Sequence, residues 1–271
     1  MTNDDERVIA RMVPMLRKVL VVDSNPASGR LLSELMRNLT HSQVWTAISN
    51  IRGMTAMEQV QPQLILVDLA ADGIDGLKFA RDVRRSEAVC RKVPIIMVTA
   101  TATAGAIMGA RDAGIHEFLR KPFTTRDLLR RLEAVTLRSR DWVEAVGYIG
   151  PDRRRFNSGD YSGALKRQVD PATTPDEIRI LQALKIIRSA IDAAGRDPEQ
   201  VLRALLAQSV NLRVAAQATS NAALGSAAIE FQRYLDKASD GQQLRPDDLE
   251  AKAALLLGFL PKVEPERGTA A

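Results

Sequence analysis

The sequence predicts an α/β fold in which a doubly wound parallel sheet of five strands is followed by a C-terminal all-α hairpin or bundle of helices. From Lys18 to about Val135, short apolar runs alternate with amphipathic helical segments, which is the pattern of a repeated strand–helix unit. The runs at 64–67 and 95–98 are apolar at every position, as in parallel strands that helices cover on both faces. After residue 174 alanine and leucine dominate.

Length and composition limit the class of protein. The 271 residues, 45% of them hydrophobic, exceed one average domain, so we expect two domains. The chain has no apolar run long enough to cross a membrane and no signal-peptide pattern at its start. Its single cysteine, Cys90, cannot form an internal disulfide or a metal cluster, which agrees with a reducing compartment. We therefore expect a cytoplasmic protein without a membrane partner.

Each predicted strand is a run of aliphatic and β-branched residues bounded by turn residues. The first, "KVLVVD", ends at Asp23, and the third, "QLILVD", ends at Asp68. The full set is expected at 18–23, 43–48, 63–68, 93–100 and 116–121.

The helices between these strands are predicted from apolar residues that recur every three or four positions. Segments 25–39 and 73–86 each place their aliphatic residues on one face. The last helix of this domain begins after Thr124, which can form a capping box with Asp127 three residues later.

A change in composition follows this first domain. Residues 147–175 are rich in Gly, Arg, Asp and Pro, which indicates a linker. Its basic run, Arg153, Arg154 and Arg155, is either solvated or a contact for a phosphate, a nucleotide or an acidic partner. The expected boundaries are an N-terminal helical extension at 1–16, the first domain at 17–137, a linker at 138–173, a helical domain at 174–262 and a disordered tail at 263–271.

Three helices are predicted in the second domain. Thr174 and Glu177 form a capping box at the start of the first helix, and Gly195 ends it. The second helix is expected from Asp197 to about residue 238, with a break near Asn221 or Gly225, and the third lies within 245–260. Small residues recur along the second helix and would allow close packing in a hairpin or in a homodimer.

Four polar residues stand at the expected carboxyl ends of the strands: Asp23, Asp68, Thr99 and Lys121. In open α/β sheets these ends meet at one edge, so the four side chains can share a pocket. Two facing carboxylates repel unless a cation lies between them, and Mg²⁺ is the oxygen-seeking choice. A phosphoryl group in this pocket meets a carboxylate nucleophile, an ammonium and a hydroxyl donor, so the predicted product is an aspartyl phosphate.

The motifs "VLVVDSN", "LILVDLAADGIDG", "IIMVTA" and "FLRKPF", in this order, resemble a response-regulator receiver domain of two-component signalling, the CheY-like family. The resemblance covers about residues 17–137 and does not extend to the helical domain. It implies a flavodoxin-like sheet with strand order 2-1-3-4-5 and a cis peptide bond at Lys121-Pro122.

The resemblance also implies roles for individual residues. Asp68 is the phosphoacceptor, Lys121 is its ion-pair partner, and Thr99 is the switch residue that moves toward the phosphoryl group. Phe118 is the aromatic that turns inward with Thr99, although an ordinary half-buried strand position remains an equal alternative. The Mg²⁺ ligands are Asp23, Asp68, the backbone carbonyl of Ala70 and, weakly or through water, Ser24.

Ser24 departs from the family pattern, because receivers usually carry a second acid there. The loss of one carboxylate should weaken Mg²⁺ binding. Two outcomes stay open: Asp23 takes over the metal and phosphorylation still occurs, or the domain serves mainly as a protein-binding platform.

The expected function is that of a cytoplasmic response regulator and phosphoprotein that passes its phosphorylation state to a helical protein-interaction domain. The phosphodonor would be a histidine kinase or a histidine phosphotransfer protein, and the downstream partner a protein. We expect no enzymatic activity beyond self-phosphorylation and autodephosphorylation. The helical domain contains neither of the two histidines, His41 and His116, so it cannot donate phosphoryl groups through histidine.

Two alternatives remain open. The receiver could be degenerate and act as a phosphorylation-independent adaptor or scaffold, or the protein could be a DNA-binding regulator. The net charge of +5 is spread over both halves of the chain, and aromatic residues make up only 4% of it. We take this to argue against nucleic acid as a partner.

Overall fold

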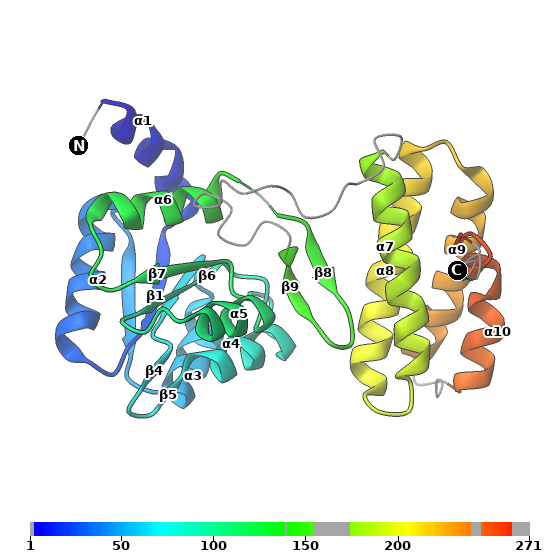
Figure 1. The fold of residues 1–271 in the computed structure, drawn as a ribbon, viewed down its shortest axis with the longest axis horizontal. Coiled ribbons are helices and arrows are strands. Elements are labelled where there is room, and N and C mark those ends of the chain that lie inside the picture. Colours follow the sequence, from blue (N-terminus) through cyan, green and yellow to red (C-terminus); the bar gives the residue numbers. More distant parts are fainter. Residues whose placement is uncertain (1–2, 139, 154–173, 240–244, 262–271) are drawn as a thin grey trace, which may run out of the picture. The chain divides into compact units, whose positions relative to one another are not determined.

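The structure is a computed structural model, and it describes residues 3–138, 140–153, 174–239 and 245–261 (Figure 1). The chain divides into two compact units. The first comprises Met1–Val143 with Tyr148–Ser162, and the second comprises Glu144–Gly147 with Gly163–Ala271. None of the helices within the described ranges combines the length and the apolarity needed to span a bilayer.

A five-stranded parallel sheet forms the centre of the first unit, in the order β2-β1-β3-β6-β7. This is the predicted order 2-1-3-4-5, because β6 and β7 are the fourth and fifth strands of the sheet along the chain, and the doubly wound fold is confirmed. The strands are β1 (Lys18–Val22), β2 (Gln43–Ala47), β3 (Leu64–Val67), β6 (Ile95–Thr99) and β7 (Glu117–Arg120).

Helices cover both faces of this sheet, which explains why the central strands are apolar at every position. One face packs against α2 (Pro26–Thr40) and α6 (Thr125–Thr136). The other packs against α3 (Asn50–Val60), α4 (Gly76–Arg85) and α5 (Ala104–Asp112).

The N-terminal extension is helical, as predicted, and consists of α1 (Asn3–Met12) and the short 3-10 helix η1 (Val13–Met15). Met12 and Leu16 are fully buried in the core beside α2 and α6. The extension is therefore part of the first hydrophobic core.

The predicted cap of α6 is present, and the structure shows a further cap at the start of α2. Thr124 and Asp127 form the capping box of α6, and the side chain of Asn25 accepts the N–H groups of Ala27 and Ser28 at the start of α2. Two short antiparallel strands, β4 (Ala70–Ala71) and β5 (Ile74–Asp75), form the turn after Asp68.

An antiparallel pair of strands, β8 (Trp142–Glu144) and β9 (Ile149–Pro151), lies within the range predicted as a linker. Gly150 packs closely against Gly114: a Cβ added to Gly150 would lie only 2.6 Å from Gly114 Cα, so the close approach requires a glycine. The guanidinium of Arg140 donates to the carbonyl oxygens of His116 and Asp152. These contacts fix the strands to the receiver-like unit.

The basic run of the linker is only partly described. Arg153 lies over the ring of Tyr148 and pairs with Asp112 at 3.0 Å. Arg154, Arg155 and the tail at 263–271 lie outside the described residues.

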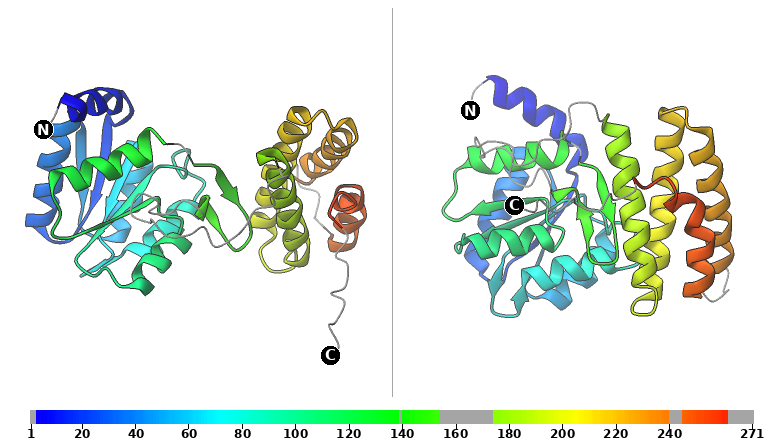
Figure 2. Two further views of the ribbon diagram at one scale, coloured as in Figure 1. Left: turned by 45° about the horizontal axis from the view of Figure 1, so that its top comes forward. Right: turned by 45° about the vertical axis from the view of Figure 1, so that its right-hand side comes forward.

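Four helices form the second unit: α7 (Pro175–Asp192), α8 (Pro198–Ala218), α9 (Ala222–Ser239) and α10 (Pro246–Leu257). They lie side by side in both views of Figure 2. The Thr174–Glu177 capping box and the Asp197 cap are confirmed. The expected break of the long helix is also confirmed, since α8 ends just before Ser220, which has a φ of 54°. The described helices confirm the predicted all-α fold.

The tip of this strand pair, Glu144–Gly147, begins at the last residue of β8 and belongs to the helical unit. Gln208 donates to the carbonyl oxygen of Glu144 at 2.9 Å, and Gln200 donates to that of Ala145 at 3.3 Å. Val146 packs against the helical core. The four-residue tip is therefore held by buried polar groups of α8.

Candidate functional site

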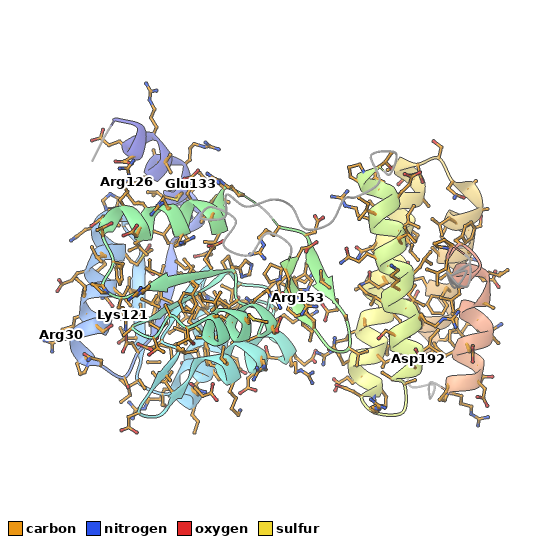
Figure 3. All side chains as sticks on the ribbon, in the orientation of Figure 1. Arg30, Lys121, Arg126, Glu133, Arg153 and Asp192 are labelled. Carbon is orange, nitrogen blue, oxygen red and sulfur yellow. The ribbon has the colours of Figure 1, made fainter. Side chains whose placement is uncertain are left out.

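Three charged side chains meet beyond the carboxyl ends of β1, β3 and β7. The Nζ atom of Lys121, labelled in Figure 3, lies 2.6 Å from Oδ2 of Asp68 and 3.0 Å from Oδ2 of Asp23. One ammonium is therefore shared by two carboxylates. The exposed fraction of the side chain is 2% for Asp23, 12% for Asp68 and 22% for Lys121, so the cluster is accessible from the side of Lys121.

The backbone of the sheet holds these residues in place. The N–H of Asp68 donates to the carbonyl of Val22 at 2.9 Å, which continues the pairing of β3 with β1. The N–H of Lys121 donates to the carbonyl of Thr99 at 2.7 Å, which continues the pairing of β7 with β6. The neighbouring Lys121-Pro122 peptide bond is cis, as the resemblance implied. The side chains thus project from the rigid edge of a buried sheet.

Electrostatics keep Lys121 charged in this position. Burial opposes its charge, but hydrogen bonds to Asp68 and Asp23 and their negative charges outweigh burial and hold the pKa of Lys121 above its usual 10.5. The ammonium is therefore a permanent cation at neutral pH.

Thr99 and Ala70 also lie at this edge. Thr99 is 3% exposed, and its hydroxyl oxygen accepts the N–H of Thr101 at 3.1 Å. Ala70 is exposed, and its N–H donates to Oδ1 of Asp68 at 3.3 Å. The structure thus brings all four strand-end residues of the prediction to one edge.

Phe118 occupies a different environment. It lies within β7 opposite Met97, is 4% exposed, and packs in the core on the side of α3, α4 and α5. Its ring is therefore already inside the protein in this structure.

The oxygen donors around Asp68 suit a hard divalent cation. Two carboxylates, the Ala70 carbonyl and the half-buried Ser24 next to Asp23 supply only oxygen ligands, and Mg²⁺ is held by one or two carboxylates together with water. Over the described ranges, however, no cluster of three or more His, Cys, Asp or Glu residues could hold a metal ion. The donor set fits Mg²⁺ with one carboxylate fewer than the family pattern.

Two residues of this site were missed in the sequence. The hydroxyl of Ser28 donates to Oδ2 of Asp23 at 2.5 Å, and the N–H of Asn25 donates to Oδ1 of Asp23 at 2.9 Å. A serine in the first turn of the following helix can reach back to an acid at the strand end, but whether it does so depends on how the helix leaves the strand.

Comparison with known proteins identifies the first unit. Residues 19–133 match the family model of the response regulator receiver domain, so this segment is a receiver domain. The match covers less than half of the chain, and the helical unit lies outside it.

Several curated proteins are similar to this chain. The DNA-binding dual master transcriptional regulator RpaA of Synechocystis is 30% identical over 45% of this chain and 50% of its own length. The transcriptional regulatory protein BaeR of Escherichia coli is 27% identical over 62% of this chain and 67% of its own length. The DNA-binding response regulator MtrA of Mycolicibacterium smegmatis is 30% identical over 51% of this chain and 59% of its own length. The chain thus spans about half to two thirds of these relatives.

Solved structures match the same part of the chain. A response regulator from Chloroflexus aurantiacus aligns with a TM-score of 0.42 and 25% identity over 45% of this chain and 99% of that chain. The receiver domain of a Pseudomonas aeruginosa sensor histidine kinase, described with a coordinated magnesium ion, aligns with a TM-score of 0.40 and 30% identity over 43% of this chain and 94% of that chain.

These relatives correct one expectation. We argued from the charge balance against nucleic acid as a partner, and this was wrong, because RpaA and MtrA are described as DNA-binding. Net charge was a poor guide, since a domain of balanced overall charge can still present a local basic surface to phosphates.

Proposed function

We propose that this chain is a response regulator whose receiver domain accepts a phosphoryl group on Asp68. The observation that carries the proposal is the single ammonium of Lys121 shared by the buried carboxylate of Asp23 and the half-buried carboxylate of Asp68 at the carboxyl edge of the sheet. An ion pair that only stabilised the fold would need one carboxylate, whereas phosphoryl transfer needs an acceptor and compensating charge at the same place.

The chemistry follows from the positions of the groups. The weakly engaged Oδ1 of Asp68 attacks the phosphorus atom of a phosphodonor, a new P–O bond forms, and the donor's leaving group departs with the electron pair of the broken bond. Lys121 then neutralises part of the charge on the phosphoryl oxygens, and the Thr99 hydroxyl donates a hydrogen bond to one of them. Asp23 keeps Lys121 oriented toward the acceptor.

A magnesium ion belongs to this proposal. Asp23, Asp68 and the carbonyl of Ala70 would hold it, with Ser24 contributing through water. When bound, Mg²⁺ would neutralise phosphoryl oxygens during transfer. Self-phosphorylation and dephosphorylation are the only reactions that we assign to the chain, and the cytoplasm remains its proposed location.

Phosphorylation would act on the rest of the protein through Thr99 and Phe118. Thr99 is joined to Lys121 through the backbone, and Phe118 lies three residues before Lys121 on β7. A shift of Thr99 toward a phosphoryl group would change the packing beside Phe118 and so bias a two-state surface.

A labelling experiment tests the acceptor. The chain is incubated with radiolabelled acetyl phosphate or phosphoramidate and millimolar Mg²⁺, and uptake is followed on a gel. We expect uptake by the wild type and by Asp72→Asn, a neighbouring acid in the turn after Asp68, and none by Asp68→Asn. Equal uptake by Asp68→Asn would remove this residue as the acceptor, and no uptake by any variant would favour the phosphorylation-independent adaptor.

The relatives favour DNA, and not a protein that binds the helical domain, as the partner through which the chain acts after phosphorylation. RpaA and MtrA are described as DNA-binding, and the 169 residues matched by the transcriptional regulator BaeR extend beyond the length of the receiver match at 19–133. We therefore extend the proposal to a DNA-binding regulator.

Fluorescence anisotropy with a labelled pool of random duplexes tests this extension on the full chain. Binding should weaken steeply as salt rises, because phosphate contacts release counterions. Acetyl phosphate should change the affinity of the wild type and leave that of Asp68→Asn unchanged. An absence of binding at low salt would reject DNA as the target.

A further inference from the structure

The carboxylate of Asp23 is nearly saturated with hydrogen-bond donors. Its Oδ1 accepts the N–H of Asn25 at 2.9 Å, and its Oδ2 accepts both the hydroxyl of Ser28 at 2.5 Å and the ammonium of Lys121 at 3.0 Å. A carboxylate offers about four acceptor positions. Three of these are taken by protein groups, which leaves about one for a cation.

The fold explains why Ser28 reaches this carboxylate. The side chain of Asn25 caps α2 and accepts the N–H groups of Ala27 and Ser28, which places Ser28 in the first turn of the helix, five residues after Asp23. Ser28 is half-buried in this turn, and its hydroxyl donates to Oδ2 of Asp23.

Asp68 is less restrained than Asp23. Its Oδ2 accepts the ammonium of Lys121 at 2.6 Å, and its Oδ1 accepts the N–H of Ala70 at the longer distance of 3.3 Å. The two acids of the site therefore differ: one is fixed by a close set of donors, and the other keeps a weakly engaged oxygen.

We propose that Ser28 is a positioning residue that fixes Asp23 as the counter-ion of Lys121 and sets the concentration of divalent cation that the site requires. The hydroxyl is a neutral donor. It therefore occupies a lone pair of Asp23 but does not offset the negative charge of this carboxylate, as a metal ion would. A divalent cation must displace this donor or share the oxygen with it. Because Ser24 supplies no second carboxylate at the end of β1, the availability of Asp23 determines how well the site binds the cation.

This inference rests on the proposed function for its context, but cation binding can be measured without a phosphodonor. Mg²⁺ binding to the full-length, unphosphorylated chain is followed by calorimetry, and Mn²⁺ binding is followed by the loss of the free-ion signal in electron paramagnetic resonance. We expect Ser28→Ala to lower the half-saturating concentration of both ions by about tenfold, which corresponds to the loss of one hydrogen bond to a charged group.

Two further variants separate this role from a structural one. Ser28→Thr keeps the hydroxyl, so its half-saturating concentration should stay near that of the wild type. Ser33→Ala removes a hydroxyl from the same helix that donates to the carbonyl of Gly29, so it matches the loss of a buried hydroxyl without touching Asp23. It should leave the half-saturating concentration at the wild-type value.

The outcomes are distinguishable from those of the labelling experiment. An unchanged or raised half-saturating concentration in Ser28→Ala, or no binding of either ion by any variant, overturns the role of Ser28, even if Asp68 is labelled normally. A lowered concentration in Ser28→Ala supports this role, even if Asp68 takes up no phosphoryl group. In that case the phosphoacceptor proposal alone falls.

Discussion

Lys121 Nζ and Asp68 Oδ2 lie 2.6 Å apart, and both side chains are largely shielded from water. Replacing Lys121 by Met would leave Asp68 facing Asp23 without a cation between them. Without Mg²⁺, we expect the free energy of unfolding of the receiver to fall by about 1–3 kcal/mol. This loss is smaller than the roughly 3–5 kcal/mol expected when a fully buried pair is broken, because the site is partly open. Mg²⁺ should restore much of this loss, since it supplies the missing positive charge.

Tryptophan fluorescence during urea unfolding measures this change. The chain has two tryptophans, Trp45 and Trp142, and both belong to the first unit, so the signal follows the unfolding of that unit. Lys78→Met is the matched control, because Lys78 pairs with Asp82 on the surface with 65% of its side chain exposed. Its effect should be small beside that of Lys121→Met, because solvent screens an exposed pair. If Mg²⁺ stabilised Lys121→Met no more than the wild type, the compensating-cation argument would fail.

Ser24→Asp should restore the acid that the family pattern carries after Asp23. A third carboxylate raises the charge around the cation, so we expect the half-saturating Mg²⁺ concentration to fall by about tenfold or more. Without Mg²⁺ the added charge should destabilise the receiver, because it is half-buried beside Asp23. Calorimetry and urea unfolding provide the two measurements. Ser24→Asn adds no charge, so it should change the half-saturating Mg²⁺ concentration and the free energy of unfolding much less than Ser24→Asp does.

Gly150→Ala should destabilise the first unit. An added Cβ would lie 2.6 Å from Gly114 Cα and 2.7 Å from the Tyr148 hydroxyl, so β9 would have to move away from the turn at Gly114. We expect a loss of about 1–3 kcal/mol in the free energy of unfolding by tryptophan fluorescence. Gly147→Ala is the control in the same hairpin, because nothing lies within 4 Å of a Cβ there. Equal effects of the two substitutions would mean that the close approach does not limit stability.

Regular patterns made most of the fold predictable. The apolar runs predicted the strands of the sheet, and the family resemblance implied their order. The capping box at Thr124 and the break near Asn221 were predictable because each depends on residues close in sequence. The strands β8 and β9 were not predicted, because they are three residues long and are held by distant groups such as Arg140 and Gly114.

The site was predictable to a similar extent. Strand-end position was enough to bring Asp23, Asp68 and Lys121 together. The contact of Ser28 with Asp23 was not predicted, because it depends on the angle at which the first turn of α2 leaves the strand. Such angles are set by packing and leave no periodic signal in the sequence.

His116 should make the receiver sensitive to acid. Its Nδ1 atom faces the N–H of Ile95 at 3.3 Å and an N–H group of Arg84 at 3.2 Å, so this nitrogen must accept and the ring must be neutral. Burial, followed by the charges of Arg84 and Arg140, lowers the pKa of His116 well below its usual 6.5. The unfolded chain binds a proton below pH 6.5 while the folded chain does not, so the stability is complete above that pH and falls as the pH drops toward the folded pKa.

Urea unfolding followed by tryptophan fluorescence at about pH 7.5 and about pH 5.5 measures this loss, to which His116 should contribute about 1 kcal/mol. The comparison is with His116→Asn, whose side-chain oxygen can accept the same two donors but does not titrate. This variant starts from a lower stability, because it packs less well, but it should lose about 1 kcal/mol less between the two pH values. Parallel losses in the two proteins would mean that His116 is protonated in the folded state or that other groups dominate, and would contradict a neutral, buried ring.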